Sequence, residues 1–370
     1  MAENKLFPAI ATIVGTTIGT GYLGIPYVIA RAGFSIGLIY IILVALFVLL
    51  INLYLGEVIL RTKGNHQLVG YAEKYLGKKG KFFVFLAMIF GIYAALLAHL
   101  IVEGRSLSYL IFENYNFAIV FSLIFWLILL NLTYIGLRAL KKYEKEAIVL
   151  VIFLVALIFF IFIDKIKTEN LSYIGEEIFS PFGVILFSLL SFSAMPEVER
   201  ILKGQEKLMK KVIFISILIP FFIYFLFTIV TVGVFGRNIN EIATISLGRF
   251  FTILGIITIS MSSFALSIAL RDMFRFDLKL GRFKGWLLAS FVPLFLFLIF
   301  YYFNLLSYVK ILAVSGIVSG GTLGIITLLM NIKAKKLGNR KPEYSTKINW
   351  LIIFVLALIF LAAVILQIFY

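Results

Sequence analysis

The sequence predicts an all-helical protein embedded in a membrane, and three observations support this prediction. Hydrophobic residues make up 62% of the 370-residue chain, well above the roughly 45 to 50% typical of soluble domains, and the mean hydropathy is +1.08. Apolar runs recur, each long enough to cross about 30 Å of hydrocarbon as a helix. Because little chain remains between them, residues 1–370 are predicted to form a single transmembrane domain.

The apolar runs predict eleven membrane spans. In chain order they cover residues 6–30, 35–60, 82–112, 116–136, 147–163, 178–196, 211–235, 246–270, 285–303, 306–332 and 349–370.

The first span is predicted to break in its middle. Residues 15–26 read GTTIGTGYLGIP, with four glycines and one proline in twelve residues. Glycine and proline weaken helical hydrogen bonding, and lipid cannot satisfy the backbone groups that are released. Interrupted spans of this kind are typical of membrane sites where a solute or an ion binds.

The sixth span carries a second candidate break, because residues 187–196 read FSLLSFSAMP and end in a proline. The spans then divide into two groups of five, residues 6–163 and 178–332, with 349–370 as an extra helix. Two consecutive groups with an odd number of spans have opposite orientations, so the two broken helices face each other. Glycines in the tenth span indicate close packing or a hinge; they are Gly316, Gly320, Gly321 and Gly324.

The charge distribution predicts the orientation. If the N-terminus is cytoplasmic, 27 of the 34 lysine and arginine residues fall on the inner side, as the positive-inside rule expects. The C-terminus is then outside a cell (inner or plasma) membrane. This distribution accounts for the net charge of +16 with the lipid bilayer as partner and without a nucleic acid. Glu57 and Arg61, near the inner end of the second span, are predicted to form an interfacial ion pair.

These segments resemble a known family. The first span, the amphipathic stretch 67–77 and the run 181–197 are similar to amino acid permeases of the amino acid-polyamine-organocation superfamily. Within it, the likeness is to the amino acid/auxin permeases and the bacterial tyrosine and tryptophan permeases. The resemblance implies the leucine-transporter fold, a five-plus-five inverted repeat with spans one and six unwound and one extra helix. It also implies symport of amino acids by alternating access, with no cofactor. The small residues and phenylalanines near span six favour a neutral, apolar or aromatic amino acid.

The breaks suggest how an amino acid would bind. Amides at the start of the outer half of span one favour its carboxylate, and carbonyls released in both breaks accept its ammonium group. Alternatively, the serine and threonine hydroxyls bond back to the preceding turn. The predicted substrate-binding residues are Thr16, Thr17, Gly19, Thr20, Gly21, His99, Phe187, Ser188, Ser191 and Phe192.

The resemblance implies one possible coupling site, a sodium ion between spans one and eight. The matching positions are the carbonyls of Gly15 and Ile18 and the hydroxyls of Ser262 and Ser263. The alternative for the serines is small-residue packing between membrane helices.

A proton site is the second possibility, because His99 and Glu103 stand one turn apart on the same face of the third span. His99 is otherwise a structural histidine, and Glu103 otherwise pairs with Arg105 or Lys310 in an outer gate. Ionisable residues at membrane depth are costly, which makes this pair a candidate for function.

Other functions are less well supported by the residues. A transporter of another small amine or organic solute would have similar breaks. A channel would need a continuous polar pore, which offset breaks flanked by aromatic residues disfavour. A membrane-embedded enzyme would need a catalytic constellation, and the chain has no cysteine, so thiolate chemistry and disulfides are excluded. The prediction is therefore a transporter and not an enzyme.

Overall fold

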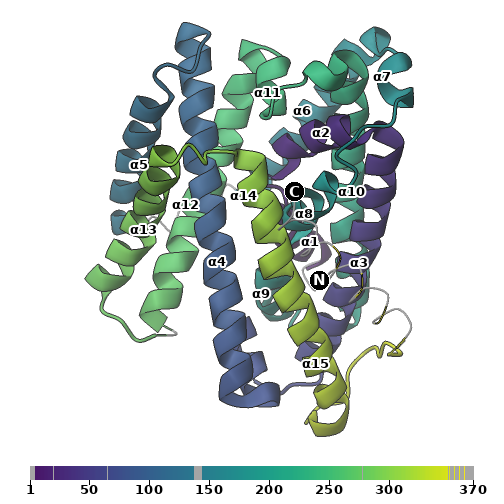
Figure 1. The fold of residues 1–370 in the computed structure, drawn as a ribbon. Coiled ribbons are helices and arrows are strands. Elements are labelled where there is room, and N and C mark those ends of the chain that lie inside the picture. Colours follow the sequence, from purple (N-terminus) through teal and green to yellow (C-terminus); the bar gives the residue numbers. More distant parts are fainter. Residues whose placement is uncertain are drawn as a thin grey trace.

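The computed structural model describes residues 5–19, 21–64, 66–136, 144–276 and 278–348, with residues 350, 354, 358 and 362. All regular structure in these ranges is helical (Figure 1). The α-helices are α1 Leu6–Thr17, α2 Gly21–Ala32, α3 Phe34–Leu60, α4 Leu68–Phe112, α5 Ala118–Ile135, α6 Glu144–Phe162, α7 Glu169–Ser172, α8 Ser180–Leu189, α9 Met195–Ile201, α10 Met209–Phe235, α11 Ala243–Ser246, α12 Arg249–Phe276, α13 Arg282–Tyr302, α14 Tyr308–Ser315 and α15 Gly321–Leu337.

Eight helical segments of the described chain are long and apolar enough to cross a membrane, and the bent pair α1 and α2 makes a ninth. Helix α6 lies where the fifth span is predicted. The eleventh predicted span, 349–370, lies outside the described residues except for four single positions. The architecture is thus that of a multi-pass membrane protein.

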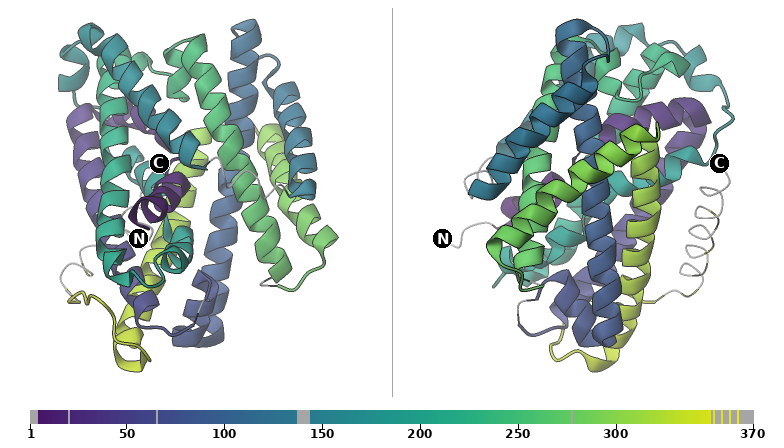
Figure 2. Two further views of the ribbon diagram at one scale, coloured as in Figure 1. Left: turned by 180° about the vertical axis from the view of Figure 1, so that it is seen from behind. Right: turned by 60° about the vertical axis from the view of Figure 1, so that its left-hand side comes forward.

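Four short helices, α1, α2, α8 and α9, are called half-helices below; they lie among the longer helices of the bundle, as Figures 1 and 2 show. Helices α3 and α10 pack against them on one side, and α14 packs between α8 and α4 on the other. Helices α5, α12 and α13 form an outer group against α4. Large apolar side chains are exposed on outer helices, for example Phe160 on α6 and Tyr302 on α13, which is the surface that lipid requires.

Two glycines show how closely α8 packs against the helices of the tenth span. A methyl group on Gly183 of α8 would lie 2.5 Å from the Ala313 carbonyl oxygen, and one on Gly316 would lie 2.0 Å from the Gly183 carbonyl oxygen. Residues Gly316–Gly320 form a π-helical turn between α14 and α15. These two glycines of α8 and the tenth span therefore serve close backbone packing.

Helix α4 bends where an amphipathic segment joins the membrane part. Gly77 has φ 70° and ψ −162° inside the 45-residue helix, a conformation that side chains other than hydrogen disfavour. The bend separates the segment 68–76 from the long helix that carries His99 and Glu103.

Candidate functional site

The first break lies between α1 and α2, whose axes are bent by 55°. Helix α1 ends at Thr17, and Ile18 leaves the helical region with φ −82° and ψ 87°. The Gly19 amide donates to the Thr17 carbonyl at 3.0 Å, so the Gly15 carbonyl loses the amide that a continuous helix would supply. The break falls inside the glycine-rich run; Thr20 lies outside the described residues.

The second break follows α8. Leu190 is extended, with φ −64° and ψ 123°, and one 3₁₀ turn, Phe192–Ala194, leads into α9. Pro196 stands in the first turn of α9, where its missing N–H costs nothing. In the described chain no backbone amide donates to the Ser188 carbonyl, which the break has released.

The two breaks touch each other. Helix α2 packs along α8, and α1 packs along α9, so the two broken helices run antiparallel. At the contact, a methyl group on Gly21 would lie 2.7 Å from the Ser188 Cα. Only glycine lets the start of α2 approach the last turn of α8 this closely.

A tyrosine of a third helix joins the two breaks. The Tyr224 hydroxyl of α10 lies 3.0 Å from the Thr17 carbonyl oxygen and 2.8 Å from the Ser188 carbonyl oxygen, and donates to both. Its side chain is buried. No sequence pattern singles out Tyr224, because a lone tyrosine in an apolar span does not distinguish a functional residue from a packing residue.

The predicted hydroxyls are engaged within their own helices. Three of them donate to the carbonyl four residues earlier at 2.7 to 2.8 Å: Thr16 to Thr12, Thr17 to Ile13 and Ser188 to Val184. This is the back-bonding alternative. The groups that the breaks leave for a ligand are therefore backbone amides and carbonyls.

Ser191 is held by another span. The Asn52 side-chain amide of α3 donates to the Ser191 hydroxyl at 2.9 Å, and both residues are fully buried. Within the described chain, the Asn52 Oδ1 atom has no hydrogen-bond partner. Phe192 is buried beside this contact and Phe187 is partly buried. Asn52, a polar residue in an apolar span, is the sequence feature that could have indicated this interhelical contact.

Helix α12 directs its two adjacent serines to different neighbours. A methyl group on Gly19 would lie 3.3 Å from the Ser262 hydroxyl, so Ser262 stands beside the first break. Ser263 instead contacts α4, with 2.6 Å between His99 Nδ1 and its hydroxyl oxygen. Because the Ser263 hydroxyl donates to the Ile259 carbonyl at 2.7 Å, we assign the shared proton to His99 Nδ1.

Glu103 forms the next contact between the same two helices. The Ser260 hydroxyl donates to Glu103 Oε1 at 2.8 Å. Glu103 is fully buried, and its Oε2 atom has no hydrogen-bond partner in the described structure. Arg105, one of the predicted gate partners, pairs instead with Glu241 at 2.5 Å. The α4 and α12 faces thus share two polar contacts, one of which ends in an unsatisfied carboxylate oxygen.

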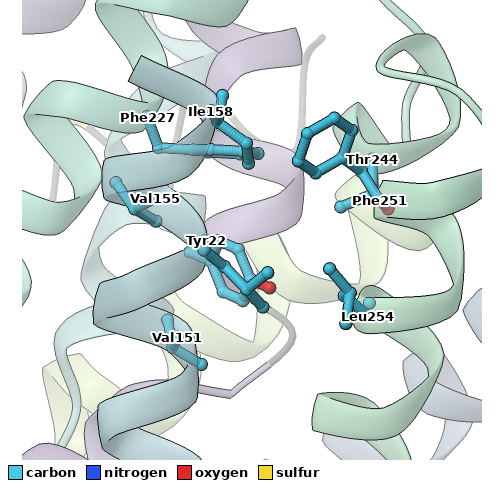
Figure 3. A pocket seen from close by; sticks show the side chains of 10 residues that line it. Tyr22, Val151, Val155, Ile158, Phe227, Thr244, Phe251 and Leu254 are labelled. Atoms are coloured by element: carbon cyan, nitrogen blue, oxygen red, sulfur yellow. The ribbon is translucent and has the colours of Figure 1, made fainter. Parts of the chain in front are cut away.

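A small pocket lies beside the first break (Figure 3). Tyr22, the second residue of α2, extends between α6 and α12, and its ring meets the Phe227 ring edge-on with centroids 5.4 Å apart. The volume of about 10 Å³ is about the room that one water molecule needs, so this pocket has no room for an amino acid in this structure. The lining residues are Tyr22, Val151, Leu154, Val155, Ile158, Phe227, Thr244, Phe251, Leu254 and Gly255.

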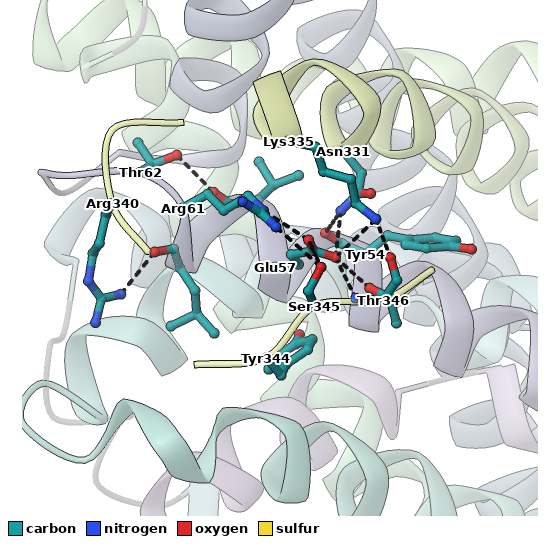
Figure 4. A network of polar contacts seen from close by, with 12 residues as sticks. Tyr54, Glu57, Arg61, Thr62, Asn331, Lys335, Arg340, Tyr344, Ser345 and Thr346 are labelled. Atoms are coloured by element: carbon teal, nitrogen blue, oxygen red, sulfur yellow. Dashed lines mark hydrogen bonds and ion pairs between the residues drawn. The ribbon is translucent and has the colours of Figure 1, made fainter. Parts of the chain in front are cut away.

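A polar network closes one end of the bundle (Figure 4). Glu57 is fully buried, and its predicted ion pair with Arg61 is present at 2.8 Å. Ser345 donates to its Oε1 at 2.8 Å, the Thr346 amide and hydroxyl donate to its Oε2 at 2.9 and 2.6 Å, and Asn331 donates at 3.3 Å. The Glu57 carboxylate therefore fastens the 338–348 segment, which follows α15, to α3.

Backbone contacts strengthen this attachment. The Arg340 guanidinium donates to the Leu60 carbonyl at 3.0 Å, and the Tyr344 hydroxyl donates to the Leu53 carbonyl at 2.8 Å. Burial, and then the nearby Glu57 carboxylate, raise the pKa of the Tyr344 hydroxyl above its ordinary value, so it stays a protonated donor. A methyl group on Gly56 would lie 2.3 Å from that hydroxyl. The sequence predicts the ion pair of Glu57 and Arg61, but no sequence pattern indicates that the 338–348 segment packs against α3.

No group of three or more histidine, cysteine, aspartate or glutamate residues that could hold a metal ion occurs among the described residues. Oxygen atoms beside the first break include backbone carbonyls and the Ser262 hydroxyl, donors that suit a hard cation.

Antiparallel broken helices, enclosed by membrane spans and with released backbone groups at their breaks, define a multi-pass membrane protein with an arrangement typical of secondary transporters. The model of the tryptophan/tyrosine permease family matches residues 2–245, and the chain belongs to this family. Two relatives from Haemophilus influenzae are the tyrosine-specific transport systems 2 and 1, 25% identical over 249 residues and 24% identical over 240. Each match covers 64% of this chain and 60% or 59% of the relative, so it spans about three fifths of the relatives' length.

Proposed function

We propose that this protein is a secondary active transporter that imports neutral amino acids, with aromatic ones such as tyrosine or tryptophan as substrates, by alternating access. The observation that carries the proposal is the contact of two broken, antiparallel helices inside a bundle of membrane spans. The family membership and the two tyrosine-specific relatives support the amino acid class. The proposed architecture is the leucine-transporter fold with one extra helix.

The substrate is proposed to bind at the breaks through backbone groups. The N-terminus of α2 offers amides and the positive end of a helix dipole to the carboxylate. The Thr17 and Ser188 carbonyls accept from the ammonium group. The side chain enters the apolar pocket beside Tyr22, with Phe187 and Phe192 near the second break. Because the pocket is closed, binding requires the surrounding helices to separate, as alternating access demands.

The coupling ion is proposed to be a proton carried by Glu103. A buried carboxylate oxygen without a hydrogen-bond partner in the described structure is the kind of group that takes up a proton when the site opens. His99, which bonds Ser263, belongs to the same face of α4. Sodium at Gly15, Ile18 and Ser262 is the second candidate, because Ser262 lies beside the first break. Ser263 fits it less well, because its hydroxyl is engaged by His99 and Ile259.

Uptake by purified protein in proteoliposomes tests the function. Radiolabelled tyrosine, tryptophan and a mixture of the other amino acids are offered under an inward proton gradient, an inward sodium gradient or neither. Proton-driven accumulation of an aromatic amino acid is the expected result. Sodium-driven accumulation transfers the coupling role to the Ser262 region, and no uptake under any gradient contradicts amino acid transport.

A further inference from the structure

Tyr224 tethers both broken helices to a helix that is not broken. It lies on α10, a continuous 27-residue helix that packs along α1 and α2. Its hydroxyl reaches the last residue of α1 and the released carbonyl in the last turn of α8. Tyr224 therefore fixes the distance between two backbone oxygens that come from residues 171 positions apart in the chain.

The two carbonyls differ in what else they accept. The Thr17 carbonyl also receives the Gly19 amide at 3.0 Å, whereas the Ser188 carbonyl receives no backbone amide in the described chain. A phenol has one proton, which the two oxygens share, and each carbonyl has two lone pairs. The Ser188 oxygen thus retains an unused lone pair, whereas the Thr17 oxygen, which already accepts the Gly19 amide, has only a share of the phenol proton for its second. A donor with several protons would complete the bonding of both oxygens.

The same face of α10 also reaches the pocket. Phe227 lies three residues after Tyr224, about one helical turn away on that face, and its ring contacts Tyr22 in the pocket wall. A zwitterion whose amino group lies at the level of Tyr224 would direct an aromatic side chain toward Phe227.

We propose that Tyr224 is a positioning residue for the amino group of the substrate. Its hydroxyl holds the Thr17 and Ser188 carbonyls at the separation at which both accept from one ammonium group. The proposal rests on the proposed function, since it assumes a transported amino acid. In the alternative role, the Tyr224 hydroxyl competes with the substrate. It would then occupy the position of the ammonium group and leave when the substrate binds.

The experiment compares Tyr224→Phe with the wild-type protein in proteoliposomes. Phenylalanine keeps the ring and removes only the hydroxyl, so the expected result is an increase of about tenfold in the KM for tyrosine, with a smaller change in the maximal rate. Inhibition by the deaminated analogue, 3-(4-hydroxyphenyl)propionate, should change little, because this competitor has no amino group. An unchanged or lowered KM, or an equal loss of affinity for the analogue, overturns the proposal.

Tyr93→Phe is the matched control, because the Tyr93 hydroxyl donates to the Leu288 carbonyl at 3.1 Å between α4 and α13, away from both breaks. It should leave the KM unchanged. If Tyr224→Phe does not fold, 3-fluorotyrosine at position 224 keeps the hydroxyl and makes it a stronger donor, and the KM should then fall; a KM that stays or rises contradicts the proposal. If wild-type protein transports no amino acid, the proposed function has failed, whereas normal wild-type uptake with an unaffected variant refutes only the role of Tyr224.

Discussion

Individual polar side chains in the interior fall into two groups. Those of Thr17 and Ser188 are satisfied by the preceding turn of their own helix, as is that of Thr16, which is exposed. Others reach a different helix, among them Asn52, His99, Glu103 and Tyr224. A hydroxyl that bonds to its own helix is unaffected when helices separate, whereas an interhelical bond must break or change partner. The second group therefore contains the residues whose replacement should alter transport.

Glu103→Gln tests the coupling residue. Glutamine keeps the size of the side chain and an acceptor for the Ser260 hydroxyl, but it cannot release a proton or carry a negative charge. We expect proton-driven accumulation to fall by about tenfold or more, because the cycle loses its proton carrier. Exchange of labelled for unlabelled substrate without a gradient should persist, because it needs no net proton movement.

Glu113→Gln provides the control, since Glu113 stands at the exposed end of the same helix and pairs with Arg249 at 2.9 Å. Its accumulation should match that of the wild-type protein. If Glu103→Gln accumulates substrate normally under a proton gradient, Glu103 is not the coupling residue.

At the scale of elements, the two broken helices approach each other closely enough for backbone contact, in addition to the bridge that Tyr224 makes. Gly21→Ala would place a methyl group 2.7 Å from the Ser188 Cα, and backbone atoms cannot rotate away. We expect α2 and α8 to separate and the protein to lose about 1 to 3 kcal/mol of stability. Thermal unfolding in detergent measures the loss, and uptake should fall in parallel.

Gly281→Ala is the matched control for this substitution. A methyl group at Gly281 would meet no atom within 4 Å, and its φ of −61° suits alanine. Its melting temperature should stay near that of the wild-type protein. Equal melting temperatures for the two alanine variants would show that the half-helices tolerate separation.

The 338–348 segment depends on one buried carboxylate. Glu57→Gln removes the charge that Arg61, Ser345 and Thr346 surround. Losing one partner of a buried ion pair costs about 3 to 5 kcal/mol, so a marked fall in the unfolding temperature is expected. Glu73→Gln disrupts an exposed pair with Lys81 at the same 2.8 Å and should cost about 0 to 1 kcal/mol. Similar losses in the two variants would contradict the importance of this network.

For the whole molecule, polar contacts fasten both ends of the bundle around a closed pocket. Arg105 and Glu241 meet near the end of α4 and the start of α14, where Glu241 also accepts from Ser307 at 2.7 Å. Glu57 holds the 338–348 segment at the other end. A pocket of about 10 Å³ has no room for an amino acid, so the proposed alternating access predicts that opening to either side releases one of these two networks.

The uneven distribution of lysine and arginine predicts an orientation of the protein in the membrane, and this orientation can be tested. The chain has no cysteine, so single-cysteine variants can be labelled without background. Lys78 and Asn116 are exposed near opposite ends of the long part of α4. A membrane-impermeant maleimide should label Asn116→Cys in intact cells and Lys78→Cys only after permeabilisation, because the positive-inside rule places Lys78 in the cytoplasm. The reverse pattern would overturn the proposed orientation.

The sequence by itself determined the features that depend on local chemistry. Apolar runs predicted the helices of the described chain, glycine and proline predicted the two breaks, and a four-residue spacing predicted the ion pair of Glu57 and Arg61. Ionisable residues in apolar spans also identified His99 and Glu103 as unusual, because burying such groups is costly whatever the fold.

Only the tertiary structure decided which groups meet. The contact of Tyr224 with the Thr17 carbonyl joins residues 207 positions apart, and that of Glu57 with Thr346 joins residues 289 apart. Hydropathy and backbone propensity are properties of a short stretch of chain, so they carry no information about a partner on another helix. That partner is set by how the helices pack, and the packing placed the Tyr224 hydroxyl against the Thr17 and Ser188 carbonyls, a bridge that no local pattern indicates.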